Sequence, residues 1–493
     1  MKPRFAALLT ALASALGPWT AWGAPANPLA ITNVTVIDAT GAPPRPGQTV
    51  LIRDRRIAVV GSASSVAVPR GATRVDGRGR YLIPALWDMH VHLANRPPGE
   101  PPSESLLPLL LAHGVVGVRD MGGDFDRIRS LRDAVASNSL RGPRIVAPGP
   151  FLDGPQEPSP MVVPAGNAEQ ARQAVRDLKA RGVDFIKLQA ALSAEAWRAG
   201  VQESVALGIP VAGHVPEAVS AWDVVGSGQR SIEHVSPALP GDASILLACS
   251  SREAELRAEL HALGEAARVE TAKPEDLRAR QRALQEALLS SYDATRAAGL
   301  FARVAAAGVT SVPTLIWSQT VLPRSKDDLA AEVPLRYVPK AMAARWRARR
   351  AEYLERAIPE TLALHRRLAE RSLALVGELH RAGVAILAGT DSFDGFVLPG
   401  FALHQELELL VAAGLTPLEA LQAATREPAR FLGEKDRGTI EAGKLADLVL
   451  LEADPLADIR HTRKIAAVVQ GGDLLDRAAL DRLLADLETR ADR

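Results

Sequence analysis

Two different spacings of apolar residues divide the chain into a central part and two ends. Near both ends, apolar and polar residues alternate in short runs that are separated by Gly, Pro, Asp and Arg. These runs cover residues 29–39, 49–62, 72–86, 437–455 and 464–472. Alternation with a period of two is typical of strands that are buried on one face. We therefore expect a small β-sandwich domain built from both chain ends, residues 27–83 and 432–493, with a terminal helix.

The central part, residues 84–431, instead alternates continuous apolar runs with helical patterns. The eight apolar runs are residues 83–93, 114–123, 142–152, 183–189, 209–215, 230–236, 308–317 and 383–392. Amphipathic helical patterns lie between several of them, for example at 167–182 and 193–208. Continuous apolar strands that alternate with helices indicate a parallel sheet covered on both faces. Eight such units predict an α/β fold of the (β/α)8 TIM-barrel type.

An open, doubly wound sheet is the alternative for the central part. It is less favoured because no glycine-rich dinucleotide-binding turn follows the first strand. Two stretches, 241–300 and 318–382, interrupt the alternation with charged, Arg/Glu/Ala-rich helical patterns. Both are longer than one crossover helix requires, so we interpret them as helical insertions on either side of strand seven.

The N-terminal segment has the pattern of a secretory signal peptide. Lys2 and Arg4 precede an apolar stretch over residues 5–16, and small residues follow. We expect a signal peptide at 1–24, with the cleavage position open between Gly23 and Ala26. A membrane anchor is the alternative, but the apolar stretch is short for a bilayer span. The protein is therefore expected to be exported, periplasmic or secreted, without stable membrane insertion after cleavage.

The overall composition narrows the classes of partner. The chain has 58 basic and 57 acidic residues, and 47% of its residues are hydrophobic. This balance does not suggest a nucleic-acid surface or a polybasic membrane patch. The single cysteine, Cys249, excludes an internal disulfide. We expect a small-molecule partner, no nucleic acid, and leave homo-oligomer formation open.

The first apolar run of the centre contains two histidines, in the stretch WDMHVHL. Side chains alternate along a strand, so His90 and His92 point to the same side, into the expected barrel. A lone inward histidine is usually a packed core residue. Two histidines at i and i+2 on the first strand are better explained as a metal clamp.

Four further candidates lie at or near the carboxyl ends of later strands, where such barrels place their chemistry. They are Lys187, His214, His234 and Asp391. A lysine inside an apolar strand is costly unless its charge is paired or removed. Carboxylation by CO₂ would convert Lys187 to N6-carboxylysine, a carbamate that can bridge two cations. The alternative is an ion pair between Lys187 and an aspartate in the barrel.

These six positions, in this order on these strands, resemble the amidohydrolase superfamily of metal-dependent hydrolases. The stretch LIPALWDMHVHL resembles its first strand, and residues 414–459 resemble its C-terminal helix and return to the β domain. The resemblance implies that His90, His92 and Asp391 hold a buried metal ion, and that His214 and His234 hold a more exposed one. It further implies that carboxylated Lys187 bridges the two.

Two divalent metal ions, with zinc expected, suit imidazole and carboxylate ligands. Such ions lower the pKa of a bridging water, which gives a hydroxide nucleophile near neutral pH. Asp391 would then act both as a ligand and as the general base that returns the proton to the leaving amine.

The lysine favours one branch of the superfamily. Imidazolonepropionase-like members, which the C-terminal text also resembles, typically use one metal and no lysine bridge. The VDFIKL stretch around Lys187 instead resembles the Xaa-Pro dipeptidase and N-acyl amino acid carboxypeptidase branch. The LQAALS that follows departs from that pattern, which puts the substrate in doubt more than the metal site.

The sequence thus predicts an exported dinuclear amidohydrolase that cleaves a carbon–nitrogen bond in a dipeptide or N-acyl amino acid. One alternative is hydrolysis of a cyclic amide, lactone or phosphoester at the same site. An alternative of another class is a non-catalytic metal- or solute-binding protein. Arg119-Asp120, at the end of strand two, is interpreted as either a supporting pair or plain packing. Trp317 is a candidate for the substrate pocket, and His404 is interpreted as structural.

Overall fold

The structure is a computed structural model that describes residues 27–94, 103–235, 244–267, 273–323, 325, 329–393 and 395–491. The expected signal peptide at 1–24 and its cleavage region lie outside these residues. Parts of both expected insertions, 241–243, 268–272, 324 and 326–328, also lie outside them. Within the described ranges, no helix combines the length and apolar character needed to cross a membrane.

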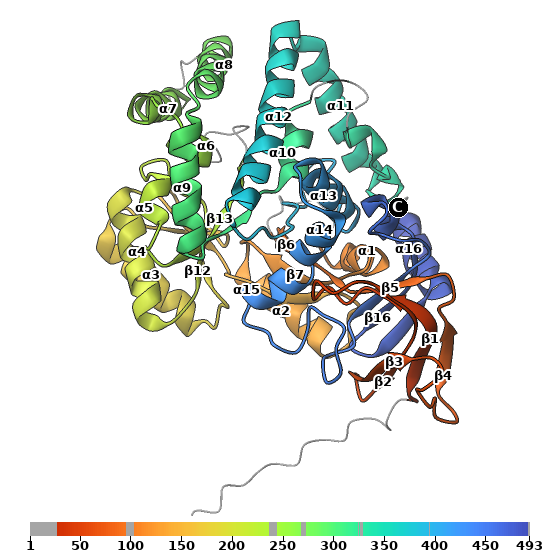
Figure 1. Ribbon diagram of the computed structural model, residues 1–493. Helices are drawn as coiled ribbons and strands as arrows, with labels where there is room; N and C mark the ends of the chain where they lie inside the picture. The colour runs from red at the N-terminus through yellow and green to blue at the C-terminus, as the bar shows by residue number, and fades with distance from the viewer. Residues whose placement is uncertain are drawn as a thin grey trace, which may run out of the picture.

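Strands from both chain ends join one eight-stranded sheet (Figure 1). Its strands are β1 Leu29–Val36, β2 Arg45–Arg53, β3 Arg56–Ser62, β4 Thr73–Asp76, β5 Tyr81–Pro84, β15 Leu448–Leu451, β16 Ile465–Gln470 and β17 Asp473–Asp476. The two ends meet where β5 pairs antiparallel with β15, with Leu82 opposite Leu450. Ile31, Ile52 and Leu450 belong to a separate apolar core under this sheet. The sandwich arrangement and its boundaries stay predictions.

The central part consists of parallel strands in two further sheets, of three and six strands. The first contains β6 Leu86–Val91, β7 Val115–Asp120 and β8 Arg144–Val146; the second contains β9 Phe151–Asp153, β10 Val162–Pro164, β11 Ile186–Leu188, β12 Val211–Gly213, β13 Gln229–Glu233 and β14 Thr310–Val312. Their side chains are almost all buried, as expected of strands that helices cover on one side and a core fills on the other.

Helices follow most of these strands and pack against them. They are α1 Leu107–Ala112, α2 Phe125–Ala136, α3 Ala168–Ala180, α4 Ala194–Leu207, α5 Ala221–Val224, α9 Ala294–Ala306, α13 Phe401–Ala412, α14 Pro417–Ala423 and α15 Arg426–Phe431. α4 illustrates the local causes: Ser193 caps its first turn by accepting from the amide of Ala196. Gly208 ends it in the left-handed region, with φ of 68°.

Backbone hydrogen bonds connect the two central sheets at both edges. Residues 385–388 lie between β14 and β6: the amide of Leu387 donates to Ser311, and the amide of Met89 donates to Ala388, both at 2.9 Å. At the other edge, the amide of Asp184, just before β11, donates at 2.9 Å to Ala147, just after β8. Residues 383–392 were expected to form a strand. They instead form two isolated bridges, one between Ile386 and Ser311 and one between Ser392 and Val91.

The expected single strand at 142–152 is two short strands, β8 and β9. Pro148, Gly149 and Pro150 separate them. Proline has no amide hydrogen to donate, and Gly149 adopts a φ of 72°, so the extended ladder cannot continue through this segment. β9 then pairs with β11 and β10 rather than with β8.

The two insertions form helical projections on the same side of the central sheets (Figure 1). The first contains α6 Ser244–Ala248, α7 Glu253–Ala267 and α8 Pro274–Ser290. The second contains α10 Leu315–Val321, α11 Lys340–Arg356, α12 Pro359–Arg381 and the short 3-10 helices η3 Leu329–Glu332 and η4 Leu335–Tyr337. Three elements remain: η1 Ser103–Ser105, η5 Ile459–Arg463 and the terminal helix α16 Arg477–Ala491.

Gly389 packs tightly against His90 of β6 and Val312 of β14. A Cβ at this position would lie 2.8 Å from Cβ of His90 and 2.6 Å from Cγ1 of Val312. We expect Gly389→Ala to lower the free energy of unfolding by about 1–3 kcal/mol, because the added methyl overpacks a rigid core. Urea denaturation measures this change. Gly264→Ala is the control, because an added Cβ on α7 meets nothing within 4 Å; equal stability of both variants would contradict the prediction.

Candidate metal centre

β6 presents three polar side chains at alternating positions, Asp88, His90 and His92. The His90 side chain is 1% exposed and the His92 side chain 20% exposed. Nδ1 of His92 lies 2.9 Å from the carbonyl oxygen of Gly122. Because a carbonyl only accepts, this nitrogen carries the hydrogen, and Nε2 keeps its lone pair for the interior of the site.

The imidazole of His90 is also oriented through its Nδ1, in this case by a carboxylate. Nδ1 of His90 lies 2.9 Å from Oε2 of Glu233, at the end of β13. Nε2 of His90 is buried and, among the described residues, has no hydrogen-bond partner. It faces Oδ1 of Asp391 at 3.4 Å. Such an orphaned nitrogen beside a carboxylate fits a cation between them.

Asp391 leaves the end of the 383–392 segment in the left-handed region, with φ of 58°. Its amide donates to the carbonyl of His90 at 2.7 Å, which ties it to β6. Its Oδ1 lies 3.2 Å from Nε2 of His92. One potential ligand atom from each of His90, His92 and Asp391 lies within 4.8 Å of the others.

The histidines of β12 and β13 lie beside this group. The rings of His214 and His234 are stacked with centroids 4.7 Å apart, and the rings of His90 and His234 lie 4.8 Å apart. Nδ1 of His234 lies 2.7 Å from the hydroxyl of Thr314 and 4.0 Å from Oδ2 of Asp391. Nδ1 of His214 is hydrogen-bonded to Oε1 of Gln189.

Lys187 lies in the middle of β11 and is 1% exposed. Its neighbour on β12 is Ala212, two residues before His214. Burial lowers the pKa of His90 and of His214 well below the usual range, and the charge of Lys187 lowers both further. Both imidazoles are therefore neutral and able to coordinate.

The pKa values of His92 and Asp391 depend on their contact with each other. Burial opposes the charged form of each group, but the contact raises the pKa of His92. The neighbouring imidazoles of His90 and His92 keep the pKa of Asp391 well below its usual range. Asp391 is thus an anion in a ring of imidazoles, which is a donor set that divalent cations such as zinc accept.

A buried ion-pair network behind His90 was not anticipated from the sequence. Arg119 on β7 donates from Nη2 to both oxygens of Glu233 at 2.8 Å, and from Nε to the carbonyl of Met89 at 2.7 Å. Ser231 also donates to Glu233, at 2.5 Å. Arg119 and Asp120 therefore have different partners. Asp120 accepts from the amides of Leu93 and Gly122.

Asp88 was also missed, although strand alternation places it on the same side as His90. It is fully buried and accepts from the amide and hydroxyl of Thr390, at 3.0 and 2.6 Å. Burial raises its pKa to about 7, against the effect of these hydrogen bonds. Through these hydrogen bonds to Thr390, Asp88 connects β6 to the segment that carries Asp391.

Glu406 on α13 holds the start of α10, the helix that carries Trp317. It is fully buried and accepts from the amides of Leu315 and Ile316, at 3.1 and 2.7 Å, so it caps the first turn of α10. Burial raises its pKa to about 8. α10 carries Trp317, whose ring lies 5.9 Å from that of His234. Elsewhere on α13, His404 bonds to Thr462 and to the carbonyl of His113.

Glu233→Gln should weaken both the fold and metal binding. A glutamine can still accept from His90, but it leaves the buried Arg119 without its counter-charge, which costs about 3–5 kcal/mol. Looser orientation of His90 should reduce metal affinity by about 10–100-fold. Urea denaturation and metal titration with a chelating competitor measure these effects.

Glu203→Gln is the matched control, since Glu203 pairs with the exposed Arg176 on the surface. It should change stability by no more than about 1 kcal/mol and leave metal affinity unaltered. Unchanged stability and affinity in Glu233→Gln would contradict the orienting role of Glu233.

Solved structures with the same fold include several amidohydrolases. A bottromycin amidohydrolase has a TM-score of 0.72 at 22% identity, over 94% of this chain and 90% of that chain. A Xaa-Pro dipeptidase with bound methionine has a TM-score of 0.62 at 19% identity, over 91% of this chain and 100% of that chain. These likenesses define the class of fold, which is that of the amidohydrolases.

The sequence itself matches the Amidohydrolase family over residues 81–475. The chain belongs to this family. Among curated relatives, an imidazolonepropionase of Deinococcus deserti is 40% identical over 82 residues, which is 16% of this chain and 20% of the relative. The chain thus matches about a fifth of the length of that relative.

Proposed function

We propose that the protein is a dinuclear metal-dependent amidohydrolase that cleaves the amide bond of a dipeptide or an N-acyl amino acid. The observation that carries the proposal is the group formed by His90, His92 and Asp391, with ligand atoms within 4.8 Å of one another. His234, His214 and Lys187 extend this group toward β11. Carboxylated Lys187 would bridge two ions, zinc being the proposed metal. The closed (β/α)8 barrel belongs to the same proposal.

The residues of the chain have separate tasks in this reaction. When bound, the divalent ions supply an acidified water and polarise the scissile carbonyl. Asp391, whose Oδ1 faces Nε2 of His90 and of His92, would accept the proton of the attacking water and return it to the leaving amine. Glu233 and Gly122 hold the two β6 imidazoles in the tautomers that direct Nε2 into the site. Trp317, beside His234, excludes water from one side.

Export to the periplasm or cell exterior is proposed from the N-terminal sequence pattern of residues 1–24. A purified precursor and the protein recovered from the host's periplasm or medium should differ in mass by the segment up to Gly23 or Ala26. N-terminal sequencing of the recovered protein tests this, and an intact Met1 would contradict it.

Elemental analysis combined with a substrate panel tests the proposed activity. We expect about two metal ions per chain, hydrolysis of dipeptides or N-acyl amino acids, and loss of that hydrolysis after dialysis against a chelator, restored by zinc. The panel includes cyclic amides, because one relative is an imidazolonepropionase. Two bound ions without turnover on any amide would favour a binding protein and overturn the proposal.

A further inference from the structure

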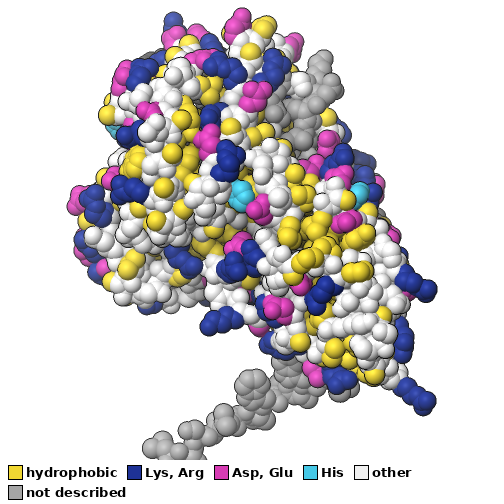
Figure 2. Space-filling view, viewed as in Figure 1, with side chains coloured by type: hydrophobic (Ala, Val, Ile, Leu, Met, Phe, Trp, Pro, Cys, Tyr) yellow, Lys and Arg dark blue, Asp and Glu magenta, His cyan; other side chains and the backbone are white. Residues whose placement is uncertain are grey.

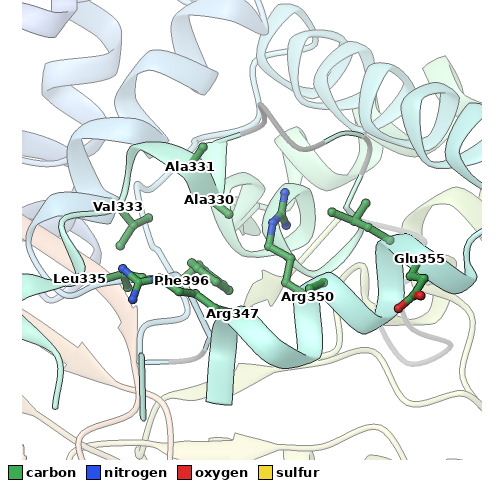
Figure 3. A pocket seen from close by; sticks show the side chains of 10 residues that line it. Ala330, Ala331, Val333, Leu335, Arg347, Arg350, Glu355 and Phe396 are labelled. Carbon is green, nitrogen blue, oxygen red and sulfur yellow. The ribbon is translucent and has the colours of Figure 1, made fainter. Parts of the chain in front are cut away.

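A pocket of about 630 Å³ lies between the second insertion and the loop that follows Asp391. It is lined by residues of η3, η4 and α11 and by Phe396, as Figure 3 shows: Ala330, Ala331, Val333, Leu335, Arg347, Arg350, Ala351, Leu354, Glu355 and Phe396. Its volume is in the range of small-molecule sites. None of the six proposed metal ligands lines it.

The walls of the pocket are apolar and rest on a packed foundation. Ala330, Val333 and Phe396 are each at most 8% exposed and belong to one apolar cluster. Trp346 of α11 packs against Phe396, with ring centroids 5.6 Å apart. This packed cluster forms one wall of the pocket, while Arg347, Ala351 and Glu355 on α11 are exposed.

Two guanidinium groups enter the apolar surroundings from one side of α11. Arg347 and Arg350 are three residues apart, so they lie one helical turn from each other on the same face. Arg350 donates to the carbonyl of Ser325 at 2.9 Å and its guanidinium lies 5.7 Å from the Phe396 ring. Figure 3 shows Arg350 extending into the pocket, and Glu355 at the far end from Arg347.

This combination selects one chemical class of ligand. A guanidinium such as that of Arg350 pairs well with a carboxylate, and the apolar part of the lining matches a hydrocarbon or aromatic body. α11 carries further positive charge at Arg345 and Arg349, so the field around the entrance favours anions. We propose that this pocket binds an apolar carboxylate, with the carboxylate at Arg347 and Arg350 and the apolar body against Phe396.

The pocket adjoins the loop that follows Asp391, through Phe396. Phe396 is five residues after Asp391, which limits their separation to about 17 Å of extended chain. Trp346 also contacts Phe393, two residues after Asp391, at 5.4 Å between ring centroids. A ligand in the pocket therefore contacts the loop that begins at Asp391, and its occupancy affects the reaction there.

Calorimetric titration with octanoate tests binding directly and does not depend on the proposed function. We expect one site, about tenfold weaker binding of the uncharged octanamide, and at least tenfold weaker octanoate binding by R347Q/R350Q. Arg349→Gln is the control, because it removes one positive charge from α11 at a position that is not among the residues lining the pocket. Ala351→Trp keeps both guanidiniums but fills the pocket, and it should abolish binding.

Absence of octanoate binding, or equal binding by wild type and R347Q/R350Q, overturns the proposal. Unchanged binding by Ala351→Trp does the same, since it would place the anion on the basic helix surface outside the cavity. Thermal melts and metal content, expected to be unaltered in all three variants, show that the fold and the metal centre are intact.

A second measurement, which rests on the proposed amidohydrolase activity, distinguishes two sources of the carboxylate. If the carboxylate belongs to the substrate, octanoate inhibits competitively and R347Q/R350Q raises KM. If it is a separate ligand, octanoate changes kcat in wild type and has no effect in R347Q/R350Q. Octanoate that binds but alters neither constant overturns the link between the pocket and the Asp391 loop.

Discussion

Asp391→Asn is expected to reduce kcat by about 10²–10⁴-fold while most of the metal remains bound. An asparagine keeps the carbonyl oxygen that faces His90 and His92, so the donor atom nearest the cation survives. It cannot accept a proton from the attacking water, however, because its oxygen is that of a neutral amide. Steady-state kinetics and elemental analysis on the same sample measure the two effects.

The matched control for this variant is Asp133→Asn, which makes the same chemical change at an exposed position of α2. It should leave kcat and metal content at wild-type values. Turnover retained within about tenfold in Asp391→Asn would remove Asp391 from the role of general base. Loss of all metal together with activity would instead assign to Asp391 only the role of a ligand.

Lys187→Ala is expected to release most of the bound metal and nearly all activity. The lysine is buried in β11 beside β12, and its carbamate is the only proposed ligand shared by both ions. Loss of a shared ligand should lower the affinity for at least one ion by more than the 10–100-fold that outer partners contribute. Elemental analysis after gel filtration measures the remaining metal.

Lys179→Ala is the control, since Lys179 is exposed on α3 and donates to the carbonyl of Leu207. It should keep both metal content and activity. A mass measurement under native conditions at raised bicarbonate should also detect the added CO₂ in wild type and not in Lys187→Ala. Full metal content in Lys187→Ala would contradict the carbamate bridge and favour a plain ion pair.

Strand periodicity was sufficient to bring several distant candidates to one place. His90 and His92 share a face of β6 because side chains alternate, and the carboxyl ends of parallel strands lie at one edge of a sheet. The same rule predicts His214, His234 and Asp391 near them. Applied one step further, it would have included Asp88, which is two residues before His90.

Other features depend on departures from regular geometry that composition does not encode. Strict alternation places the side chains of Glu233 and His234 on opposite faces. His234 has a φ of 65°, so both side chains contact the site, with Glu233 behind His90 and His234 beside Asp391. The division of 142–152 into two strands could have been predicted from Pro148 and Pro150 in its middle.

The pocket beside Phe396 could not be predicted from the sequence. Its walls come from η3, η4, α11 and a loop that is more than forty residues later in the chain. Helical patterns predict that α11 exists but not which of its arginines meets an aromatic ring. On the face that Figure 2 shows, acidic and basic side chains are interspersed.

Because β5 pairs with β15, the sheet formed by the two chain ends can be completed only late in synthesis of the polypeptide. β5 ends at residue 84 and β15 begins at residue 448, so the N-terminal hairpins lack their neighbouring strand until nearly the whole polypeptide has been synthesised. Closing a loop of that length is slow compared with the pairing of adjacent strands. A nascent chain that has not yet released residues 448–476 therefore keeps an open edge, a state suited to chaperones or to threading through a translocation channel.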